Sequence, residues 1–589
     1  MMAGAASGQA AGTETKFIER EMVLDRRYLN LPVKADAPRR TVNIMVGGEI
    51  VRAFEIELAG DQPDFWAFTD VSEWRGQKAT LRLDPIGRLA KPELQEDSAK
   101  RRPSPQALDA LRLSDEIEDA ATLYREPLRP QFHYTTPRGW LNDPHGLIFH
   151  EGEYHLFYQL QPFSMKSLNS DKHWGHAVSR DLVHWQELPV ALRPGRDGGM
   201  WSGGSLIDKK NTAGFQQGPE PAMLLFYTAT GRSAMNPKAA EPGDFVQGIA
   251  YSNDRGRSWT KYSGNPILQN ITPLNRDPHV FWHEPSKKWI MVLYVGEPIS
   301  NPGNHYKARI LSSENLKDWV SESSIDGLFD CPVLFELPLD GKATDTRWII
   351  HCANMKYRVG RFDGKTFTPE TDFIDSHKAN VSESAYAAQI FRNLDEPRTV
   401  QLAWLYDETP GTRQMMTFPC ELTLVTTAAG PRLRWQPVRE IERLYGPARS
   451  WRDLPITPDG QLVARAHGRH LEIKARIQVG KATEVQIAVR GIPIVLHPKS
   501  KQLTAFGYAV PLTLKDNLLR IRILVDETSL EIFADDGFVY LPLSVPLVPE
   551  DDTVSLSARG GQAMAETLDI VELKSIWPEP VNAPATAQR

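Results

Sequence analysis

The segment Ser179-Arg180-Asp181-Leu182-Val183-His184-Trp185 is the first copy of a short pattern that recurs through the middle of the chain. In each copy a serine begins a polar turn, and a tryptophan follows six or seven residues later. The second copy runs from Ser252 to Trp259 and the third from Ser313 to Trp319. A short apolar strand precedes each turn and another follows it. Each copy therefore predicts a strand–turn–strand unit.

The spacing of these copies indicates a repeat architecture. Successive tryptophans lie 74 and 60 residues apart, and a degenerate fourth copy runs from Gly360 to Phe367. Repeats of this length, made of short strands and turns, are typical of β-propeller blades with four strands each. At roughly 60 to 70 residues per blade, the region 129–446 predicts five blades. The alternative is that such short turns recur by chance.

The region before the repeats predicts a small N-terminal β domain at 16–94. Apolar residues alternate there on both sides of Gly47-Gly48, a dipeptide typical of a hairpin turn. The stretch 95–128 begins with many charged residues, and its later apolar residues have helical spacing. This pattern predicts a linker with short helices. Trp66 and Trp74 could bind polysaccharide, but single tryptophans more often pack in a core or interface. We therefore expect this domain to pack on the propeller.

The region after the repeats predicts a β-sandwich. Apolar and polar residues alternate in several runs between 447 and 577, as in Leu519-Arg-Ile-Arg-Ile-Leu-Val525. Strict alternation of this kind is typical of antiparallel strands with one buried face. The region is poor in clustered carboxylates with unusual neighbours, so we expect no chemistry there. The whole chain is thus predicted to be all-β.

The composition excludes several classes of protein. A length of 589 residues implies more than one domain. The net charge of −6 argues against a nucleic-acid partner, and no apolar run approaches the roughly 20 residues of a membrane span. Three cysteines are too few for a disulfide framework or a zinc ribbon. The 15 tryptophans supply flat apolar faces that could stack on sugar rings.

The first 15 residues are small and polar and contain no apolar stretch like that of a signal peptide. Two explanations remain open. The protein is cytoplasmic, or its signal has been removed. The small-residue leader favours the second explanation and hence a secreted or periplasmic location.

Three aspartates occur in similar settings. Asp143, Asp277 and Asp330 are each followed, directly or after one residue, by a proline and then by a short apolar strand. The first strands of propeller blades surround a central channel, so these acids should converge there. One Asp-Pro strand entry would be an ordinary turn device, but three indicate a site, because a buried carboxylate is costly. Converging carboxylates are typical of glycoside hydrolysis, in which one contacts the anomeric carbon and another protonates the leaving oxygen.

The first of these segments, Trp140-Leu141-Asn142-Asp143-Pro144-His145-Gly146, resembles the signature Trp-Met-Asn-Asp-Pro-Asn-Gly of glycoside hydrolase family 32. This family comprises β-fructofuranosidases, inulinases and levanases. Further resemblances occur in the family's order at Gln159, Trp174-Gly175-His176, Trp201-Ser202-Gly203, Arg276-Asp277-Pro278, Tyr386-Ala387-Ala388-Gln389 and Ser529-Leu530-Glu531-Ile532-Phe533. The resemblance covers about 129–577 and leaves the N-terminal domain outside it.

The resemblance implies a five-bladed propeller followed by a sandwich, and retaining hydrolysis of terminal β-D-fructofuranosyl linkages in inulin, levan or sucrose. By position, Asp143 would be the nucleophile, Asp277 the stabiliser of the transition state and Asp330 the acid/base. The implied fructose subsite comprises Asn142, Gln159, Trp174, Trp201, Ser202 and Arg276. No cofactor is implied.

Two positions depart from the family pattern. Asp330 stands where the family has glutamate, and its shorter side chain places the carboxyl up to about 1.5 Å further back. Other carboxylates that could replace it are Glu322, Glu336 and Glu383. His145 replaces an asparagine beside the nucleophile, where we expect it only to change a turn.

Other functions remain open. A fructosyltransferase would use the same site, and the aspartate at 330 would also suit a carbohydrate-binding propeller that has lost catalysis. His173-x-x-His176 has the spacing of metal ligands, but no cysteine joins the pair and His176 already matches the Trp-Gly-His motif. We therefore expect no metal.

Overall fold

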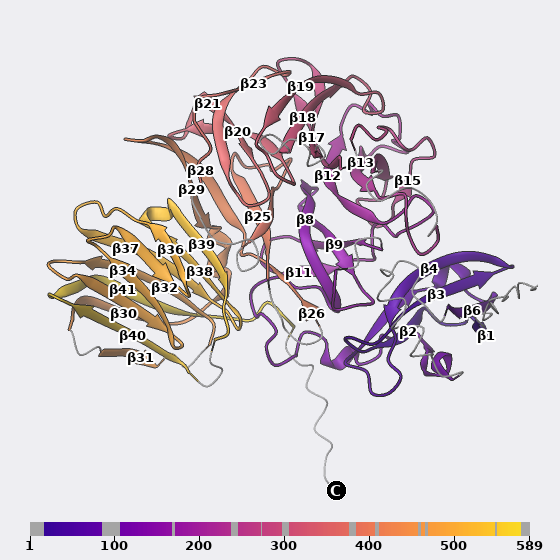
Figure 1. Ribbon diagram of the computed structural model, residues 1–589, viewed down its shortest axis with the longest axis horizontal. Helices are drawn as coiled ribbons and strands as arrows, with labels where there is room; N and C mark the ends of the chain where they lie inside the picture. Colours follow the sequence, from indigo (N-terminus) through magenta and orange to yellow (C-terminus); the bar gives the residue numbers. More distant parts are fainter. Residues whose placement is uncertain are drawn as a thin grey trace, which may run out of the picture. The chain divides into compact units, whose positions relative to one another are not determined.

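The structure is a computed structural model that describes residues 17–84, 106–167, 171–236, 245–272, 274–296, 306–375, 385–406, 412–457, 461–465, 469–547 and 551–578. Their regular elements are strands and short 3-10 helices (Figure 1). None of the helices in these ranges is long and apolar enough to cross a membrane. The chain forms two compact units: the first runs to Ala120 and includes the loops Pro162–Ser164 and Ser233–Pro237, and the second contains the rest.

The first unit contains two antiparallel sheets, with strand orders β1-β6-β3-β4 and β5-β2-β7. Its strands are β1 (Ile18–Val23), β2 (Tyr28–Val33), β3 (Arg39–Val46), β4 (Glu49–Glu57), β5 (Phe65–Asp70), β6 (Lys78–Asp84) and β7 (Arg112–Ser114), and the 3-10 helix η1 spans Ser72–Trp74. Gly47 and Gly48 both have positive φ, at 59° and 84°. A two-residue hairpin turn of type I′ requires this conformation, and glycine adopts it without strain.

The described part of the predicted linker, from residue 106, contains a strand as well as short helices. It contains the short 3-10 helices η2 (Ala107–Ala110) and η3 (Ala120–Thr122), with β7 between them. β7 pairs with β2, so this stretch completes a sheet of the first unit. Trp66 is buried and its ring lies 4.6 Å from the Arg112 guanidinium, so the indole offers no free platform for a sugar.

The central part of the second unit begins with three antiparallel sheets whose strands follow one another in chain order. The first contains β8 (Gly139–His150), β9 (Glu153–Gln161), β10 (His173–Ser179) and β11 (Trp185–Glu187). The second contains β12 (Met200–Asp208), β13 (Ala222–Ala229), β14 (Val246–Ser252) and β15 (Thr260–Lys261). The third contains β16 (Arg276–His283), β17 (Lys288–Gly296), β18 (Tyr306–Ser313) and β19 (Val320–Asp326). Sequential sheets of this kind are typical of propeller blades.

Two further antiparallel groups follow, joined by the single parallel pair Leu339↔Leu424. One group consists of β20 (Val333–Leu339), β21 (Lys342–His351), β22 (Tyr357–Phe362) and β23 (Phe367–Pro369). The other consists of β24 (Tyr386–Ile390), β25 (Thr399–Leu405), β27 (Met415–Met416), β28 (Cys420–Thr427) and β29 (Gly430–Pro437). The short strand β26 (Thr412–Arg413) pairs in parallel with β8 and so connects the end of this region to its beginning.

The Ser-to-Trp repeats share a backbone conformation as well as a sequence pattern. Leu182, Arg255 and Leu316 occupy the same place in the three turns, and their φ angles are 64°, 57° and 65°. The indole Nε1 of Trp259 donates to Gly256 O at 3.0 Å, and that of Trp319 donates to Leu316 O at 3.1 Å. Equivalent positions that share an uncommon left-handed conformation indicate one repeated structural unit.

The C-terminal part forms the predicted sandwich of two six-stranded sheets, ordered β30-β41-β32-β37-β38-β39 and β31-β40-β33-β34-β35-β36. The first sheet contains β30 (Tyr445–Ile456), β32 (Leu471–Gln478), β37 (Leu518–Val525), β38 (Ser529–Ala534), β39 (Val539–Ser544) and β41 (Ala563–Leu573). The second contains β31 (Gln461–Arg465), β33 (Glu484–Val489), β34 (Ile492–His497), β35 (Gln502–Ala505), β36 (Tyr508–Pro511) and β40 (Thr553–Arg559). The 3-10 helix η4 (Arg439–Leu444) precedes β30, and η5 (Asp535–Gly537) lies between β38 and β39.

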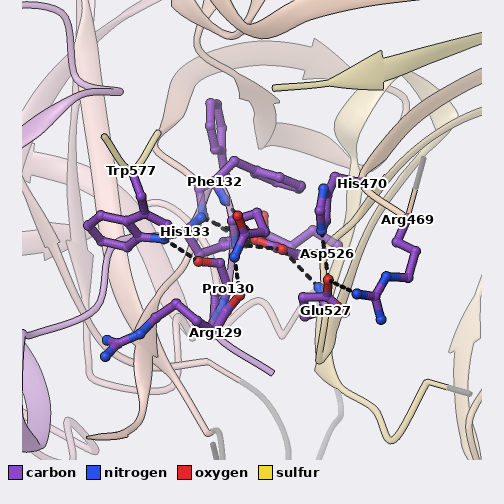
Figure 2. A network of polar contacts seen from close by, with 12 residues as sticks. Arg129, Pro130, Phe132, His133, Arg469, His470, Asp526, Glu527 and Trp577 are labelled. Atoms are coloured by element: carbon purple, nitrogen blue, oxygen red, sulfur yellow. Dashed lines mark hydrogen bonds and ion pairs between the residues drawn. The ribbon is translucent and has the colours of Figure 1, made fainter. Parts of the chain in front are cut away.

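A buried ionic cluster joins the start of the central region to the sandwich (Figure 2). His133 Nδ1 lies 2.7 Å from Asp526 Oδ2, and His133 Nε2 lies 3.1 Å from Glu531 Oε1. All three side chains are fully buried. The backbone amides of Gln131 and Phe132 also donate to the Asp526 carboxylate, at 2.7 Å and 3.0 Å. Because both ring nitrogens of His133 face carboxylates, both carry protons and the ring is an imidazolium.

Within this cluster the pKa of His133 is raised and that of Asp526 is lowered, and both shifts favour the charged forms. Burial alone lowers the pKa of His133, but the hydrogen bonds to Asp526 and Glu531 and the two negative charges raise it to about 9. Burial alone raises the pKa of Asp526, but the hydrogen bond to His133 and the imidazolium charge bring it to about 2. The folded second unit thus binds a proton on His133 more tightly than the unfolded chain does.

Replacing His133 with glutamine should destabilise the second unit by about 3 to 5 kcal/mol, because breaking a buried ion pair leaves an uncompensated charge. The contribution of His133 is complete below its ordinary pKa of 6.5 and is lost as the pH rises through about 9. That of Asp526 is present above 3.8 and is lost as the pH falls through about 2. Thermal unfolding at a series of pH values measures both effects.

The matched control is His184→Gln, because His184 is half-exposed and pairs with Asp181 at the surface. This variant should change stability by no more than about 0.5 kcal/mol. The wild-type protein should lose stability between neutral and alkaline pH more steeply than His133→Gln does. Equal alkaline slopes in the two proteins would contradict the assigned role of the imidazolium.

Candidate active site

Most of the predicted site residues lie at irregularities in the inner strands β8, β12 and β16, and β24 has a similar irregularity, whereas Gln159 and Trp174 lie on β9 and β10 and Asp330 precedes β20. The register of each of the four irregular strands shifts near its start, between Leu141 and Pro144, Trp201 and Gly203, Arg276 and His279, and Tyr386 and Gln389. A β-bulge bends its strand and redirects the side chains beside it. Gly203 is needed at the second bulge, since a Cβ there would lie 1.8 Å from Phe226 O. The bulges thus turn side chains from four inner strands toward one region.

Asp143 receives three hydrogen bonds from three different strands. Asn142 Nδ2 donates to its Oδ1 at 2.8 Å, Trp404 Nε1 donates to the same oxygen at 2.9 Å, and Ser202 Oγ donates to Oδ2 at 2.7 Å. These donors come from β8, β25 and β12. The carboxylate is therefore held in one orientation while its side chain remains partly exposed.

Asp277 and Asp330 share the guanidinium of Arg276. Arg276 Nε lies 2.8 Å from Asp330 Oδ1 and 3.5 Å from Asp277 Oδ2. Tyr386 OH donates to the second oxygen of Asp330 at 3.1 Å. The Cys331 amide donates to Asp277 Oδ2 at 3.2 Å. The structure thus brings the second and third predicted carboxylates into one contact group.

The backbone at both carboxylates is left-handed. Asp277, Asp330 and Cys331 have φ angles of 62°, 61° and 41°. This region is uncommon outside glycine, and residues held in it cluster at functional sites. Aspartate tolerates it better than most residues because its short polar side chain can bond locally. The local backbone therefore suits an aspartate at position 330.

Burial and the nearby Asp330 carboxylate raise the pKa of Asp277 well above its ordinary value, while the Arg276 guanidinium lowers it. One cation serves two carboxylates here, so the pair holds a proton to higher pH than an isolated aspartate would. Burial also raises the pKa of the Cys331 thiol and of the Tyr386 phenol. Both groups are therefore neutral near pH 7.

Two other predicted subsite residues are Gln159, which is buried, and Trp201, which is partly exposed. Gln159 Nε2 donates to Met200 O at 3.1 Å, and among the described residues its buried Oε1 has no hydrogen-bond partner. Trp201 is partly exposed and lies 4.8 Å from the Phe245 ring. Gln159 therefore keeps an unused acceptor that a hydroxyl could satisfy.

The structure places Trp174, a predicted subsite residue, in the interior of the protein. Its side chain is fully buried, and its Nε1 donates to Trp201 O at 3.0 Å. His145 packs on its ring at a centroid distance of 3.9 Å. Burial lowers the pKa of His145, and both ring nitrogens lack partners within the described ranges. His145 and Trp174 thus form a buried layer beneath the bulge of β8.

The alternative acids lie elsewhere or outside the described residues. Glu322 accepts a hydrogen bond from Ser312 at 2.7 Å and lies 3.4 Å from Lys365. Glu336 bonds to Thr346. Glu383 lies outside the described residues. Neither described glutamate contacts the Arg276 group.

Two groups of described residues have ligand atoms close enough to surround a metal ion: Asp277, Asp330 and Cys331, and His150, Glu151 and Glu220. The first group already has Arg276 as its counter-charge, which disfavours a second cation. His173 and His176 lie on the same strand, three residues apart, so they face opposite sides and cannot share one ion.

The sequence reasoning missed Lys172, Trp404 and the hydroxyl of Tyr386. Lys172 is buried, its Nζ donates to Asn142 Oδ1 at 3.2 Å, and it lies 5.7 Å from the centre of the Trp201 ring. Burial lowers the pKa of Lys172, while Asp143, Asp330 and Asp277 raise it. A lysine before a strand is normally solvated, so the sequence contained no signal for its burial.

Comparison with known proteins identifies the family. The family model described as "Glycosyl hydrolases family 32 N-terminal domain" matches residues 133–437, and that described as "Glycosyl hydrolases family 32 C terminal" matches 440–572. The chain belongs to glycoside hydrolase family 32. This glycoside hydrolase is 33% identical over 519 residues to a levanase of Bacillus subtilis, a match that covers 78% of the chain and 72% of the relative.

Further similar proteins are also named as enzymes that act on fructans. An extracellular exo-inulinase of Aspergillus niger is 30% identical over 532 residues, covering 77% of the chain and 96% of the relative. The crystal structure of an exo-inulinase from Aspergillus awamori matches with a TM-score of 0.67 and 27% identity, covering 77% of the chain and all of that structure. The prediction of a propeller followed by a sandwich is thereby confirmed, and the count of five blades stays a prediction.

Replacing Lys172 with methionine should reduce kcat/KM of the glycoside hydrolase about tenfold, the loss expected for one charge-assisted contact. The acidic limb of the pH–rate profile should shift to higher pH, because a nearby cation favours ionised carboxylates. A pH–rate profile on sucrose measures both. Lys481→Met, which removes an exposed lysine of the sandwich, is the control. An unchanged acidic limb in Lys172→Met would contradict this role.

Proposed function

We propose that this glycoside hydrolase releases terminal β-D-fructofuranosyl groups from fructans or sucrose with retention of configuration. Its family and its relatives, named levanase, exo-inulinase and invertase, support hydrolysis of fructosyl linkages. The observation that carries the mechanism is the pairing of an oriented Asp143 with the Arg276-linked Asp277 and Asp330. Retaining glycosidases use one carboxylate as nucleophile and another as acid and then base.

In the first step Asp143 attacks the anomeric carbon of the fructosyl ring. The bond from that carbon to the leaving oxygen breaks, and Asp330 delivers a proton to the oxygen, forming a fructosyl ester on Asp143. The proton comes from the carboxylate pair, which retains it because Asp277 is buried and Arg276 compensates only one negative charge. Orientation of the nucleophile by three donors lowers the entropic part of the barrier.

In the second step Asp330 takes a proton from water, and the water oxygen attacks the anomeric carbon. The ester bond breaks, Asp143 regains its charge, and fructose leaves with its configuration retained. Asp277 would hold ring hydroxyls in both steps and stabilise the oxocarbenium-like transition state.

The subsite would be formed by side chains at the bulges of β8, β12 and β16 and by Gln159 of β9. Gln159 Oε1 is an unused buried acceptor for a sugar hydroxyl. Asn142, Ser202 and Arg276 contact the carboxylates and would also reach the ring, and partly exposed Trp201 would supply an apolar wall. Lys172 would keep Asn142 in position through its hydrogen bond.

Replacing Asp143 with asparagine should reduce the rate by on the order of 10⁴-fold or more, because it removes the attacking oxygen while preserving the side chain's shape. Glu322→Gln is the matched control and should retain normal activity, since Glu322 bonds to Ser312 instead. Release of fructose from sucrose is the measurement. Full activity in Asp143→Asn would rule out this nucleophile.

Replacing Asp330 with asparagine should abolish the alkaline limb of the pH–rate profile, because the proton donor is lost. Asp330→Glu keeps the chemistry but moves the carboxyl, and a shift of about 1 Å costs on the order of 100-fold in rate. It should therefore retain the alkaline limb at a lower rate. If Asp330→Asn keeps that limb, another group donates the proton.

Product analysis with sucrose, inulin and levan tests the reaction itself. Free fructose as the sole product released from inulin or levan supports exo-hydrolysis. New oligosaccharides would indicate transfer to a sugar instead of water. Binding without turnover would indicate a carbohydrate-binding protein. The aspartate at position 330, which is shorter than the family's glutamate, is the observation that favours this alternative.

A further inference from the structure

A second cavity lies further along the same inner strands that carry the active-site residues. Its volume is about 420 Å³, within the range of small-molecule sites. Its walls include Ile148 of β8, Ser205 of β12 and Val280 of β16. These residues follow Asp143, Ser202 and Asp277 by three to five positions, which is about 10 to 17 Å along a strand. The cavity is therefore separate from the active site.

The cavity is bordered by cations. Lys209, Lys210 and Arg392 line it, and Glu284 is the acidic residue among its described lining. Glu284 is already engaged, because it bonds to Lys287 and accepts a hydrogen bond from Trp282 Nε1 at 2.5 Å. Lys210 Nζ lies over the Trp282 ring at 4.7 Å. Positive charge thus exceeds negative charge around this space.

Arg392 is the central cation, and its contacts are with neutral groups. Its Nη2 donates to Leu334 O at 2.6 Å and lies 3.2 Å from His279 Nε2. Burial lowers the pKa of Arg392 to about 9 and keeps His279 neutral. No carboxylate pairs with Arg392 among the described residues. A guanidinium in such a setting gains when an anion binds, because its charge is otherwise uncompensated.

Arg392 is fixed in position by the backbone. Its amide donates to Leu147 O at 3.0 Å, and its carbonyl accepts from the Phe149 amide at 2.9 Å. These bonds join the segment after β24 to β8, so the guanidinium projects from a rigid connection. The buried ring of His351 lies close enough to lower the pKa of His279 further. Pre-organised charge of this kind reduces the cost of ordering a site on binding.

The remaining walls are apolar. Phe281, Trp289, Ile148 and Val280 face the cavity, and the Arg392 guanidinium lies 5.1 Å from the centre of the Phe281 ring. Apolar walls favour a ligand with an apolar body, whereas the cations favour a negatively charged end. A neutral sugar would leave the cations uncompensated and the walls poorly matched.

We propose that this cavity binds a small carboxylate with an apolar, ring-containing body, whose carboxylate contacts Arg392 and the two lysines. The body would lie against Phe281 and Trp289. This site is independent of the proposed hydrolysis and would remain even if that assignment failed.

Isothermal titration calorimetry of the full chain with three probes tests the site. Indole-3-acetate supplies both features, indole-3-acetamide removes the charge with little change of shape, and acetate removes the apolar body. We expect saturable binding of indole-3-acetate at one site per chain, and at least about tenfold weaker binding of the other two. Absence of saturable binding by indole-3-acetate, or equal binding of the amide or acetate, overturns the proposal.

Variants locate the binding in the second cavity. Arg392→Met should weaken binding of indole-3-acetate about tenfold. Because Arg392 also bonds to Leu334 O, the double variant Lys209→Gln/Lys210→Gln provides a second test with exposed side chains. It should weaken binding as well, whereas Lys481→Gln, which removes an exposed lysine of the sandwich that does not line the cavity, should not. Unchanged binding in the double variant overturns the proposal.

Competition with fructose separates the two sites. Saturating fructose should leave the affinity for indole-3-acetate unchanged, and Asp143→Asn should bind the probe as the wild-type protein does. If fructose displaces the probe, the anion binds beside Arg276 and Lys172 in the active site, and the second site is rejected.

Discussion

The pairing of the last central strands with the first is the constraint on which the proposed active site depends. The backbone of Arg392 bonds to Leu147 and Phe149 of β8, and β26 pairs with the start of the same strand. This closure brings Trp404 to the Asp143 carboxylate, although the two residues are 261 positions apart. Tyr386, from the same late sheet, reaches Asp330. Without the closure, Asp143 would lose one of its three donors and Asp330 its phenol contact. The site is therefore a property of the closed ring of sheets, and the long-range contacts have to form before it can work.

The charged side chains of the inner strands also need compensating charges, and the sign of the excess charge differs between the two ends of these strands. At one end, three carboxylates lie near Arg276 and Lys172. At the other, Arg392 and two lysines border a cavity whose single described acid already has partners. The same strands thus carry an acid-rich region and a cation-rich region. Such a separation of charge is costly to bury unless ligands or water complete each end. The acid-rich end is the basis of the proposed hydrolysis, and the cation-rich end is the basis of the proposed anion site.

Much of the fold and part of the site could be predicted from the sequence. The Ser-to-Trp turns are predictable because each is closed by contacts within a few residues, as the Trp259 and Trp319 hydrogen bonds illustrate. The three aspartates are recognisable because each is followed closely by a proline and a short apolar run, and because the surrounding residues resemble a known family. Lys172 and Trp404 could not be found in this way, since their roles come from contacts between distant strands. Trp174 in the subsite stays a prediction: a motif gives the position of a residue but not the direction of its side chain, and here the side chain is buried and donates to Trp201 O.

The ionic cluster of Figure 2 also limits how this protein can be shortened. His133 is six residues before β8, while both of its acidic partners belong to the sandwich. A chain ending after the central sheets would keep the histidine but lose both carboxylates, together with the acceptor of the Gln131 and Phe132 amides. Apolar surface would be exposed at the same place. The catalytic half is therefore not a separable module, and for protein engineering the smallest workable gene fragment extends through the last strand of the sandwich.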